Sequence, residues 1–296
     1  GRGRENTAGR LYAVNYGRTA SAAIDPIEKK PLYHFHPGSQ ILSIGPNSCN
    51  LSCKFCQNSE ISQFTVPTEK VNPRSLADIA EERNSIGVAY TYTEPFMWYE
   101  FLLDCCAEFR KRGMLNVLVT NGYVNPEPFA KLAPLIDAMN IDLKSMDESF
   151  YYKLCGGVHL KPVLKTIETA YEAGIHIELT QLLISGANDH PEQIARTVDW
   201  IAGIGREIPL HFSRYFPRHK YRAPATKPDT LKSAYDIAAA KLDWVYVGNI
   251  SLDVGSHSLC PDCKALLVER RGYSTMIENL DGEKCGNCGR KVYFRN

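Results

Sequence analysis

The sequence has no excess of charge of either sign. Its 296 residues include 34 basic and 33 acidic side chains, a formal net charge of +1. This balance does not indicate a nucleic-acid partner or an anionic membrane surface, because both favour strongly basic proteins. No apolar run approaches the roughly 20 residues that a membrane-spanning helix needs. With 44% hydrophobic residues, the chain can bury a full core as one large domain or two unequal ones.

Cysteine, in contrast, is plentiful, and most of its ten copies fall into short-spaced groups of the kind that bind metals. Disulfide-rich secreted domains are much shorter, and their cysteines are paired to staple a small core. We therefore expect a reducing, cytoplasmic location, where these thiols stay free to hold metal.

Three of the cysteines, Cys49, Cys53 and Cys56, form a C-x3-C-x2-C motif directly after the strand-like run 41–45. Iron–sulfur clusters are held by Cys thiolates, and a four-iron cube normally takes four of them. Three thiolates would leave one iron with an open coordination position, where a substrate or cofactor can bind. The alternatives are a zinc site without its fourth ligand, or buried cysteines that act as small hydrophobic residues. The polar loop around the motif favours the cluster.

A repeated alternation of strand and helix begins at Ile41, after a β-rich preface over residues 10–40. Such alternation predicts a parallel sheet with α-helical crossovers. Six or seven units favour a partial (β/α) barrel, although periodicity alone does not separate this from a doubly wound sheet. The expected strands are 41–45, 88–93, 115–120, 138–143, 175–184, 210–216 and 244–250, and the expected helices, each opening on Pro, are 95–112, 162–173, 191–203 and 228–241.

Polar side chains occur toward the ends of most of these strands. In (β/α) barrels, functional groups gather at the carboxyl ends of the strands. One such residue would be a loop cap, but a ring of them predicts a site. The residues concerned are Tyr92, Thr93 and Glu94, then Asn121, Asp142, Lys144, Glu178, Thr180, His211, Ser213, Arg214 and Asn249.

The C-terminal segment carries a second cysteine signal. Cys260 and Cys263 form one C-x2-C pair, Cys285 and Cys288 form another, and 21 residues with strand-like runs lie between them. Four thiolates complete a tetrahedron, so these residues predict a structural zinc ribbon. Iron in a rubredoxin-type site, or an auxiliary iron–sulfur cluster, is the alternative, because these centres also take thiolates.

Several phrases of the chain resemble one group of proteins. The motif itself, with Phe55 before its last Cys, is similar to that of the radical S-adenosylmethionine (SAM) enzymes. The phrases 25–31 (DPIEKKP), 34–39 (HFHPGS), 53–58 (CKFCQN) and 61–63 (ISQ) resemble the AmmeMemoRadiSam-system radical SAM proteins, which are pyruvate-formate-lyase-activating-enzyme-like.

The resemblance implies a fold class and a division of the chain. The fold would be α/β, a partial (β/α)6-type radical SAM barrel over residues 41–255. A β-rich preface over 1–40 would precede it, and a zinc-ribbon-like segment over 256–296 would follow. Because similar proteins carry an upstream Cys-rich segment and this chain starts at Gly1 without Met, we expect the sequence to be truncated at its N-terminus.

The resemblance also assigns roles to the polar ring. Cys49, Cys53 and Cys56 would hold a [4Fe-4S] cluster, and Phe55 would lie by the adenine of SAM. Similar enzymes bind the methionine ammonium with a Gly-Gly-Glu-Pro segment, and Tyr92, Thr93 and Glu94 stand at its first three positions. Both glycines are thus absent, and Glu94 has the alternative role of a helix-start acid.

Four further candidate contact residues follow from the same resemblance or from position on the strands. Asn121 is expected to bind ribose hydroxyls. Asp142 and Lys144 match an Asp-Leu-Lys stretch that helps to hold SAM, and Lys144 would meet its carboxylate. An ion pair of little energetic worth is the alternative for these two. His211 is expected to contact ribose or substrate, and a buried structural histidine is the alternative.

The implied function is reductive cleavage of SAM to a 5′-deoxyadenosyl radical, which abstracts hydrogen from a protein, peptide or small-molecule substrate. Expected partners are a reductant such as flavodoxin or ferredoxin, and a protein substrate or AMMECR1-like and Memo-like proteins. The alternative function is a non-catalytic iron–sulfur and zinc protein in electron transfer or assembly. Glu94, Asp142 and Lys144 favour the enzyme, since an electron carrier has no need of them.

Overall fold

The main sheet has eight strands, of which seven run parallel to one another. The computed structural model describes residues 3–296. The strand order is β12-β11-β10-β9-β8-β7-β5-β4, and β4 is antiparallel to β5 at one edge. The strands are β4 (Ser21–Pro26), β5 (Gln40–Gly45), β7 (Gly87–Tyr90), β8 (Leu115–Thr120), β9 (Ala138–Asp142), β10 (His176–Leu183), β11 (Leu210–Arg214) and β12 (Val245–Gly248).

The parallel strands follow one another in chain order without reversal. A doubly wound sheet reverses its order at a switch point, whereas the wall of a (β/α) barrel grows in one direction. The sheet therefore confirms the expected α/β fold of partial-barrel type, and each of the seven expected strands is present.

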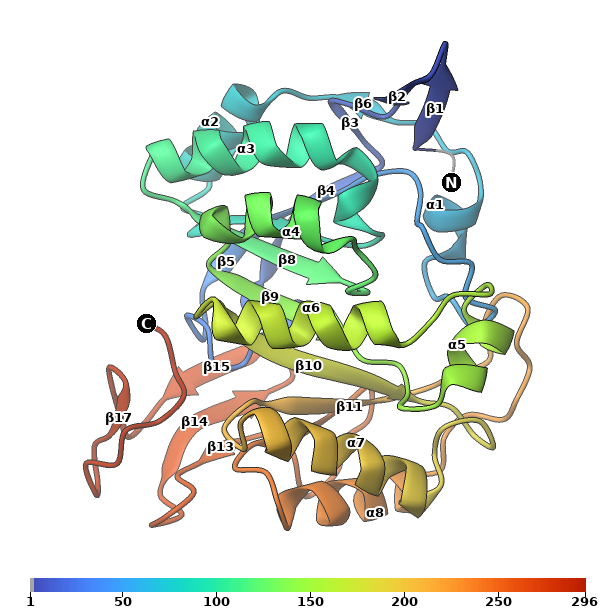
Figure 1. Cartoon of the computed structure of the whole chain (residues 1–296). Helices are drawn as coiled ribbons and strands as arrows, with labels where there is room; N and C mark the ends of the chain where they lie inside the picture. The colour runs from blue at the N-terminus through green and yellow to red at the C-terminus, as the bar shows by residue number, and fades with distance from the viewer. Residues whose placement is uncertain (1–2) are drawn as a thin grey trace.

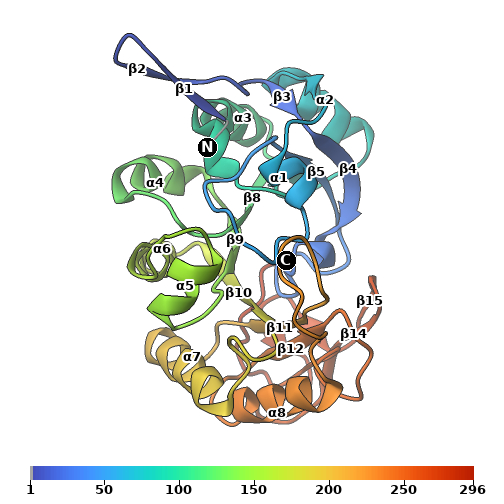
Figure 2. The ribbon, with the colours of Figure 1, turned by 90° about the vertical axis from the view of Figure 1, so that its right-hand side faces the viewer.

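Helices cover the outer face of the sheet, as the two ribbon views show for α3, α4, α6, α7 and α8 (Figures 1 and 2). Proline stands in the first or second position of five α-helices, where its missing N–H costs no hydrogen bond. The expected helix 95–112 splits into η2 (Pro95–Trp98) and α3 (Tyr99–Lys111). The others are α1 (Ser59–Gln63), α2 (Pro73–Glu82), α4 (Pro126–Leu132), η3 (Ala133–Leu135), α5 (Glu148–Leu154), α6 (Lys161–Glu172), α7 (Pro191–Ile204) and α8 (Pro228–Ala239).

The segment after β4 closes the inner face of the sheet at the end where the strands begin. It forms the short helix η1 (Ile27–Lys29) and places Ile27, Leu32 and Phe35 against small and branched inward side chains of the sheet. These three residues are fully or almost fully buried. The boundary expected at residue 40 therefore falls inside β5, whose residues pair with those of β4 from the expected preface.

A buried carboxylate ties this segment to the far strands. Glu178 on β10 accepts hydrogen bonds from the backbone N–H groups of Tyr33 (3.0 Å) and His34 (2.7 Å). Its side chain also bonds to His176 (3.2 Å) and His211 (2.6 Å). Burial alone would raise the pKa of Glu178, but the bonds from the two histidines outweigh it and hold that pKa well below its usual value.

The C-terminal residues pack against the same end of the barrel. Strands β13 (Ser258–Leu259), β14 (Leu266–Arg271) and β15 (Ser274–Ile277) form a three-stranded antiparallel sheet. Phe294 stacks on His34 with ring centroids 3.8 Å apart. Two-stranded pairings join β1 (Arg4–Thr7) to β2 (Arg10–Ala13), β3 (Arg18–Thr19) to β6 (Glu69–Lys70), and β16 (Leu280–Asp281) to β17 (Lys284–Cys285).

Across residues 3–296, every helix is too short or too polar to cross a membrane.

Candidate active site

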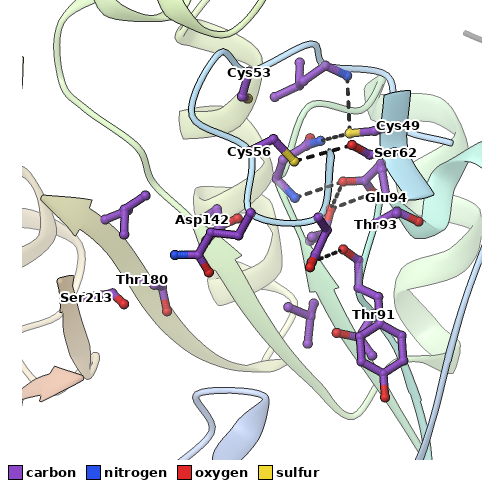
Figure 3. A pocket seen from close by; sticks show the side chains of 18 of the residues that line it. Cys49, Cys53, Cys56, Ser62, Thr91, Thr93, Glu94, Asp142, Thr180 and Ser213 are labelled. Carbon is purple, nitrogen blue, oxygen red and sulfur yellow. Dashed lines mark hydrogen bonds between the residues drawn. The ribbon is translucent and has the colours of Figure 1, made fainter. Parts of the chain in front are cut away.

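A cavity of about 620 Å³ lies at the carboxyl ends of the parallel strands. Ten of the eleven side chains expected at the cluster or at SAM line it, and they come from the loop after β5 and from the ends of β7, β8 and β9. Figure 3 shows Cys49, Cys53 and Cys56 at one end, with Thr180 and Ser213 across from them. The ten are Cys49, Cys53, Phe55, Cys56, Tyr92, Thr93, Glu94, Asn121, Asp142 and Lys144.

The cysteine loop begins where β5 ends, at a point of close backbone approach. A Cβ on Gly45 would lie only 2.4 Å from the carbonyl oxygen of Thr91, so glycine is required there. Asn47 then fastens the loop, because its side-chain amide donates to the carbonyl oxygens of Ile61 (2.6 Å) and Phe64 (2.7 Å). The loop is therefore held before any metal binds.

The thiols are surrounded by polar groups that can support thiolates. Cys49 Sγ accepts from the backbone N–H of Leu51 (3.4 Å) and from the amide of Asn121 (3.6 Å), and Cys56 Sγ lies 3.4 Å from Ser62 Oγ. Burial raises the pKa of Cys49 to about 12, so metal binding must displace its proton.

The donor set fits an iron–sulfur cluster, since thiolate is the ligand that such clusters take. The Cys155 thiol touches that of Cys53, and this hydrogen bond and burial raise the pKa of Cys53. Cys155 belongs to neither cysteine motif of the sequence. Within residues 3–296, however, the sulfurs of Cys49, Cys53 and Cys56 do not all lie within 4.8 Å of one another, as those of the C-terminal cysteines do. In a four-iron cluster each thiolate binds a different iron, so the three sulfurs do not need to lie so close together.

Glu94 is a fully buried carboxylate with several donors around it. It accepts from Thr120 Oγ1 (2.8 and 3.0 Å) and from the backbone N–H groups of Asn121 (2.9 Å) and Phe96 (3.3 Å). Burial raises its pKa to about 7, although these hydrogen bonds pull in the other direction. A cation placed beside it would restore the charged form, so the site favours a positively charged ligand. The bond to Phe96 also makes Glu94 a helix cap, as the alternative role predicted.

Residue 92, where similar enzymes have glycine, adopts a backbone conformation typical of glycine. Tyr92 adopts a left-handed backbone conformation, φ +67°, which glycine takes without strain and other residues take at a cost of about 1–3 kcal/mol. Its hydroxyl donates to Asp25 (2.8 Å), and the Lys30 ammonium lies 4.9 Å from its ring centroid. Thr93 fastens the same turn by donating to the Pro46 carbonyl (2.7 Å). The turn thus keeps a glycine-like backbone conformation at position 92 although the residue is tyrosine.

The remaining expected residues occupy the cysteine side of the cavity. Lys144 Nζ lies 3.0 Å from the Asp142 carboxylate, and Phe55 is buried against Phe150 with ring centroids 5.6 Å apart. The Asn121 amide donates to Asn50 Oδ1 (2.8 Å), and its oxygen accepts from the N–H of Tyr123 (2.8 Å). Asn121 therefore positions the cysteine loop in this structure.

His211 is the exception among the expected residues, because it does not line this cavity. It lies deeper along β11, bonded to Glu178 and stacked on Tyr246 with ring centroids 5.0 Å apart. Tyr33 covers its other edge at a centroid distance of 4.8 Å. The expected contact to ribose or substrate is replaced by the alternative, a buried structural histidine.

The wall opposite the cysteines includes residues to which sequence reasoning gave no role. Asp25 binds the ammonium groups of Lys29 (2.9 Å) and Lys30 (2.8 Å), and Lys29 lies 5.5 Å from the ring centroid of Tyr273. All four line the cavity. The phrase 25–31 contained three of them, but only as a mark of resemblance, and nothing in the sequence pointed to Tyr273 in the turn between β14 and β15.

The C-terminal cysteines form a compact group. The sulfurs of Cys260 and Cys288 lie 3.7 Å apart, as do those of Cys263 and Cys285, and all four fall within 4.8 Å of one another. A tetrahedral zinc with Zn–S bonds of about 2.3 Å separates its sulfurs by about 3.8 Å. The four thiols therefore fit a single metal ion.

Comparisons with known proteins agree with this geometry. The family model of the Radical SAM superfamily matches residues 43–201. The chain belongs to the Radical SAM superfamily, whose fold its sheet and cysteine loop display.

Individual relatives show how far the similarity extends. An uncharacterized protein of Methanocaldococcus jannaschii, MJ0808, is 43% identical over 98% of this chain and 88% of its own length. The 4-hydroxyphenylacetate decarboxylase activating enzyme of Clostridium scatologenes is 28% identical over 39% of this chain and 37% of its own. Streptococcus suis SuiB, solved with S-adenosylmethionine, shares the fold over 71% of this chain and 52% of its own, with a TM-score of 0.56 and 16% identity.

The contact between the thiols of Cys53 and Cys155 leads to a first prediction. If Cys49, Cys53 and Cys56 hold the cluster, Cys53→Ala removes most of the iron bound after anaerobic reconstitution, whereas Cys155→Ala keeps it. Iron and sulfide analysis together with the visible absorption of the cluster measures this. Loss of iron in Cys155→Ala, with Cys53→Ala unaffected, would reverse the assignment.

Proposed function

We propose that this protein is a radical SAM enzyme that reductively cleaves SAM and abstracts hydrogen from a substrate. The observation that carries the proposal is the meeting of three thiols and a buried carboxylate in one cavity of about 620 Å³. When bound there, a [4Fe-4S] cluster with one open iron supplies the electron that breaks SAM into methionine and a 5′-deoxyadenosyl radical.

Different residues of the cavity bind different groups of SAM. Glu94 accepts the methionine ammonium, and Lys144, oriented by Asp142, meets the carboxylate. Phe55 packs near the adenine, and the turn at Tyr92 and Thr93 brings backbone groups close to the methionine. The buried Glu94 and Phe55 keep water away from their part of the cavity, which radical chemistry requires.

The substrate would bind between SAM and the part of the cavity wall that contains Lys29 and Tyr273. The similarity to an activating enzyme supports hydrogen abstraction from a partner protein, as in glycyl-radical activation. A peptide or small molecule handled with AMMECR1-like and Memo-like proteins fits the AmmeMemoRadiSam resemblance. A cytoplasmic location and a flavodoxin or ferredoxin as reductant belong to the same proposal, since free metal-binding thiols need reducing conditions.

A non-catalytic electron carrier is the second candidate, and the cavity argues against it. A carrier gains nothing from a buried carboxylate with a raised pKa at a strand end, because such a group costs stability unless a cation binds it. Glu94 is such a group.

The catalytic claim predicts a defined product. Anaerobically reconstituted protein, reduced with dithionite and given SAM, releases 5′-deoxyadenosine and methionine, measured by chromatography and mass spectrometry. The Cys56→Ala variant, which lacks one cluster ligand, provides the background. Release no greater than that of Cys56→Ala would exclude the enzyme.

Glu94 predicts a pH dependence of SAM binding. Its pKa of about 7 means that the empty site is mostly protonated at pH 6 and charged at pH 8, so affinity for the SAM ammonium rises across this range. In Glu94→Gln, affinity at pH 8 falls about tenfold or more, as expected for a lost charge-assisted bond, and the rise disappears. Calorimetry of SAM binding measures both.

The matched control is Glu60→Gln, which removes a carboxylate from an exposed position on α1. This variant keeps the affinity and the pH profile of the unmodified protein. An unchanged pH profile in Glu94→Gln would place the SAM ammonium elsewhere.

We further propose that the C-terminal cysteines hold structural zinc. Four thiolates fill a tetrahedron and leave no position for substrate, and the ion holds together a segment with little core of its own. Because Tyr273 reaches the cavity from this segment, the metal also stabilises one wall of the site.

Metal analysis tests the zinc proposal. Purified protein contains about one zinc per chain. That zinc survives Cys49→Ala, Cys53→Ala and Cys56→Ala but leaves in the double variant Cys260→Ser with Cys285→Ser. Iron in place of zinc, or zinc that leaves with Cys49, contradicts it.

A further inference from the structure

Three segments meet behind the cysteine loop and expose a common surface. The backbone N–H of Lys54 donates to the carbonyl of Leu154 (2.8 Å), and that of Lys220 donates to the carbonyl of Lys54 (2.9 Å). In Figure 1 the loop after β11 passes beside α5 at the edge where the strands end. We call this the cluster-side surface, built from residues 54–64, 152–154 and 216–222.

Cations without acidic partners gather on this surface. Lys54, Lys153, Arg218, Lys220 and Arg222 are exposed, and none of them forms an ion pair within residues 3–296. Elsewhere in the described chain many exposed cations are paired, such as Arg206 and Lys241. The surface contains one acidic side chain, Glu60, against these five cations, while the protein as a whole carries a net charge of only +1, so the surface is a local concentration of positive charge.

Exposed aromatic rings lie among these cations. Tyr152 is 63% exposed, Phe64 53% and Phe216 40%. Phe64 contacts the ring of His219, and the Arg214 guanidinium lies 4.8 Å from the ring centroid of Phe216. Exposed aromatic and Arg side chains together are enriched at protein–protein interfaces, where they contribute most of the affinity. Positive charge with aromatic anchors favours a protein partner that is acidic.

The position of the surface indicates what that partner delivers. Cys53 is buried, while the next residue, Lys54, is exposed on the cluster-side surface. The cluster ligand Cys53 therefore lies one residue from this surface, while Phe55, Cys56, Asn58 and Ser62 of the same segment line the SAM cavity. A carrier protein docked here would therefore bring its electron close to the cluster ligands.

We propose that the cluster-side surface docks an acidic one-electron carrier protein. This inference rests on the proposed function, because reductive cleavage of each SAM consumes one electron, which the carrier loses and the cluster gains. Complementary charge brings the carrier onto the surface rapidly, and the aromatic rings then fix its orientation.

Reduced flavodoxin of net negative charge is the probe. Its binding to the reconstituted protein is measured by calorimetry, and the rate of cluster reduction by stopped-flow absorbance, at about 0.02 M and about 0.3 M ionic strength. The unmodified protein binds flavodoxin more weakly, and is reduced more slowly, at the higher salt. The double variant Lys54→Glu with Lys220→Glu lowers both the affinity and the rate about tenfold at low salt and loses most of the salt dependence.

The matched control is Lys111→Glu with Lys131→Glu, the same change of charge at exposed positions near the ends of α3 and α4. This control stays within about twofold of the unmodified protein, because its charges lie outside the docking surface. Reduction by dithionite, and SAM cleavage driven by dithionite, stay unchanged in both variants.

The outcomes separate this inference from the proposed function. Absence of dithionite-driven SAM cleavage in the unmodified protein removes the enzymatic proposal, whereas flavodoxin affinity and cluster reduction remain measurable without SAM. Equal loss in the two double variants, or no loss in Lys54→Glu with Lys220→Glu, overturns the docking site. The latter result assigns the surface to a protein substrate or another partner.

Discussion

The site depends on one constraint, the parallel alignment of the strands. Because β5, β7, β8 and β9 run in the same direction, their carboxyl ends lie at one edge of the sheet. Residues separated by nearly a hundred positions, such as Cys49 and Asp142, meet there in a single cavity. Every assignment of cluster or SAM ligands presupposes this edge, so a change in strand order would disperse the site.

The same edge contains features that cost stability, and the opposite end of the barrel offsets them. Glu94 is buried without a cation, and Tyr92 adopts a left-handed backbone. At the end where the strands begin, apolar residues around Ile27 fill the sheet interior. There Glu178 is buried too, but four donors satisfy it. A rigid closed end thus supports an end that holds a buried carboxylate without a cation and a strained backbone turn.

Much of this arrangement could be predicted from the sequence, because β-branched runs alternate with helices and a short motif marks the loop. The depth at which a strand residue lies inside the barrel could not be predicted from the sequence. His211 and Ser213 share one face of β11, yet only Ser213 reaches the cavity, since Tyr33 covers His211. Cys155 and Tyr273 approach the site from segments with no motif. Contacts that depend on tertiary packing produce no recognisable pattern in the local sequence.

The central claim is a four-iron cluster with one iron free for SAM. Mössbauer spectroscopy of protein reconstituted with iron-57, recorded with and without SAM, tests it most directly. The account predicts that one of the four irons changes its spectrum when SAM binds while the other three do not. Four irons that stay indistinguishable in the presence of SAM, or the absence of any cluster, would contradict it.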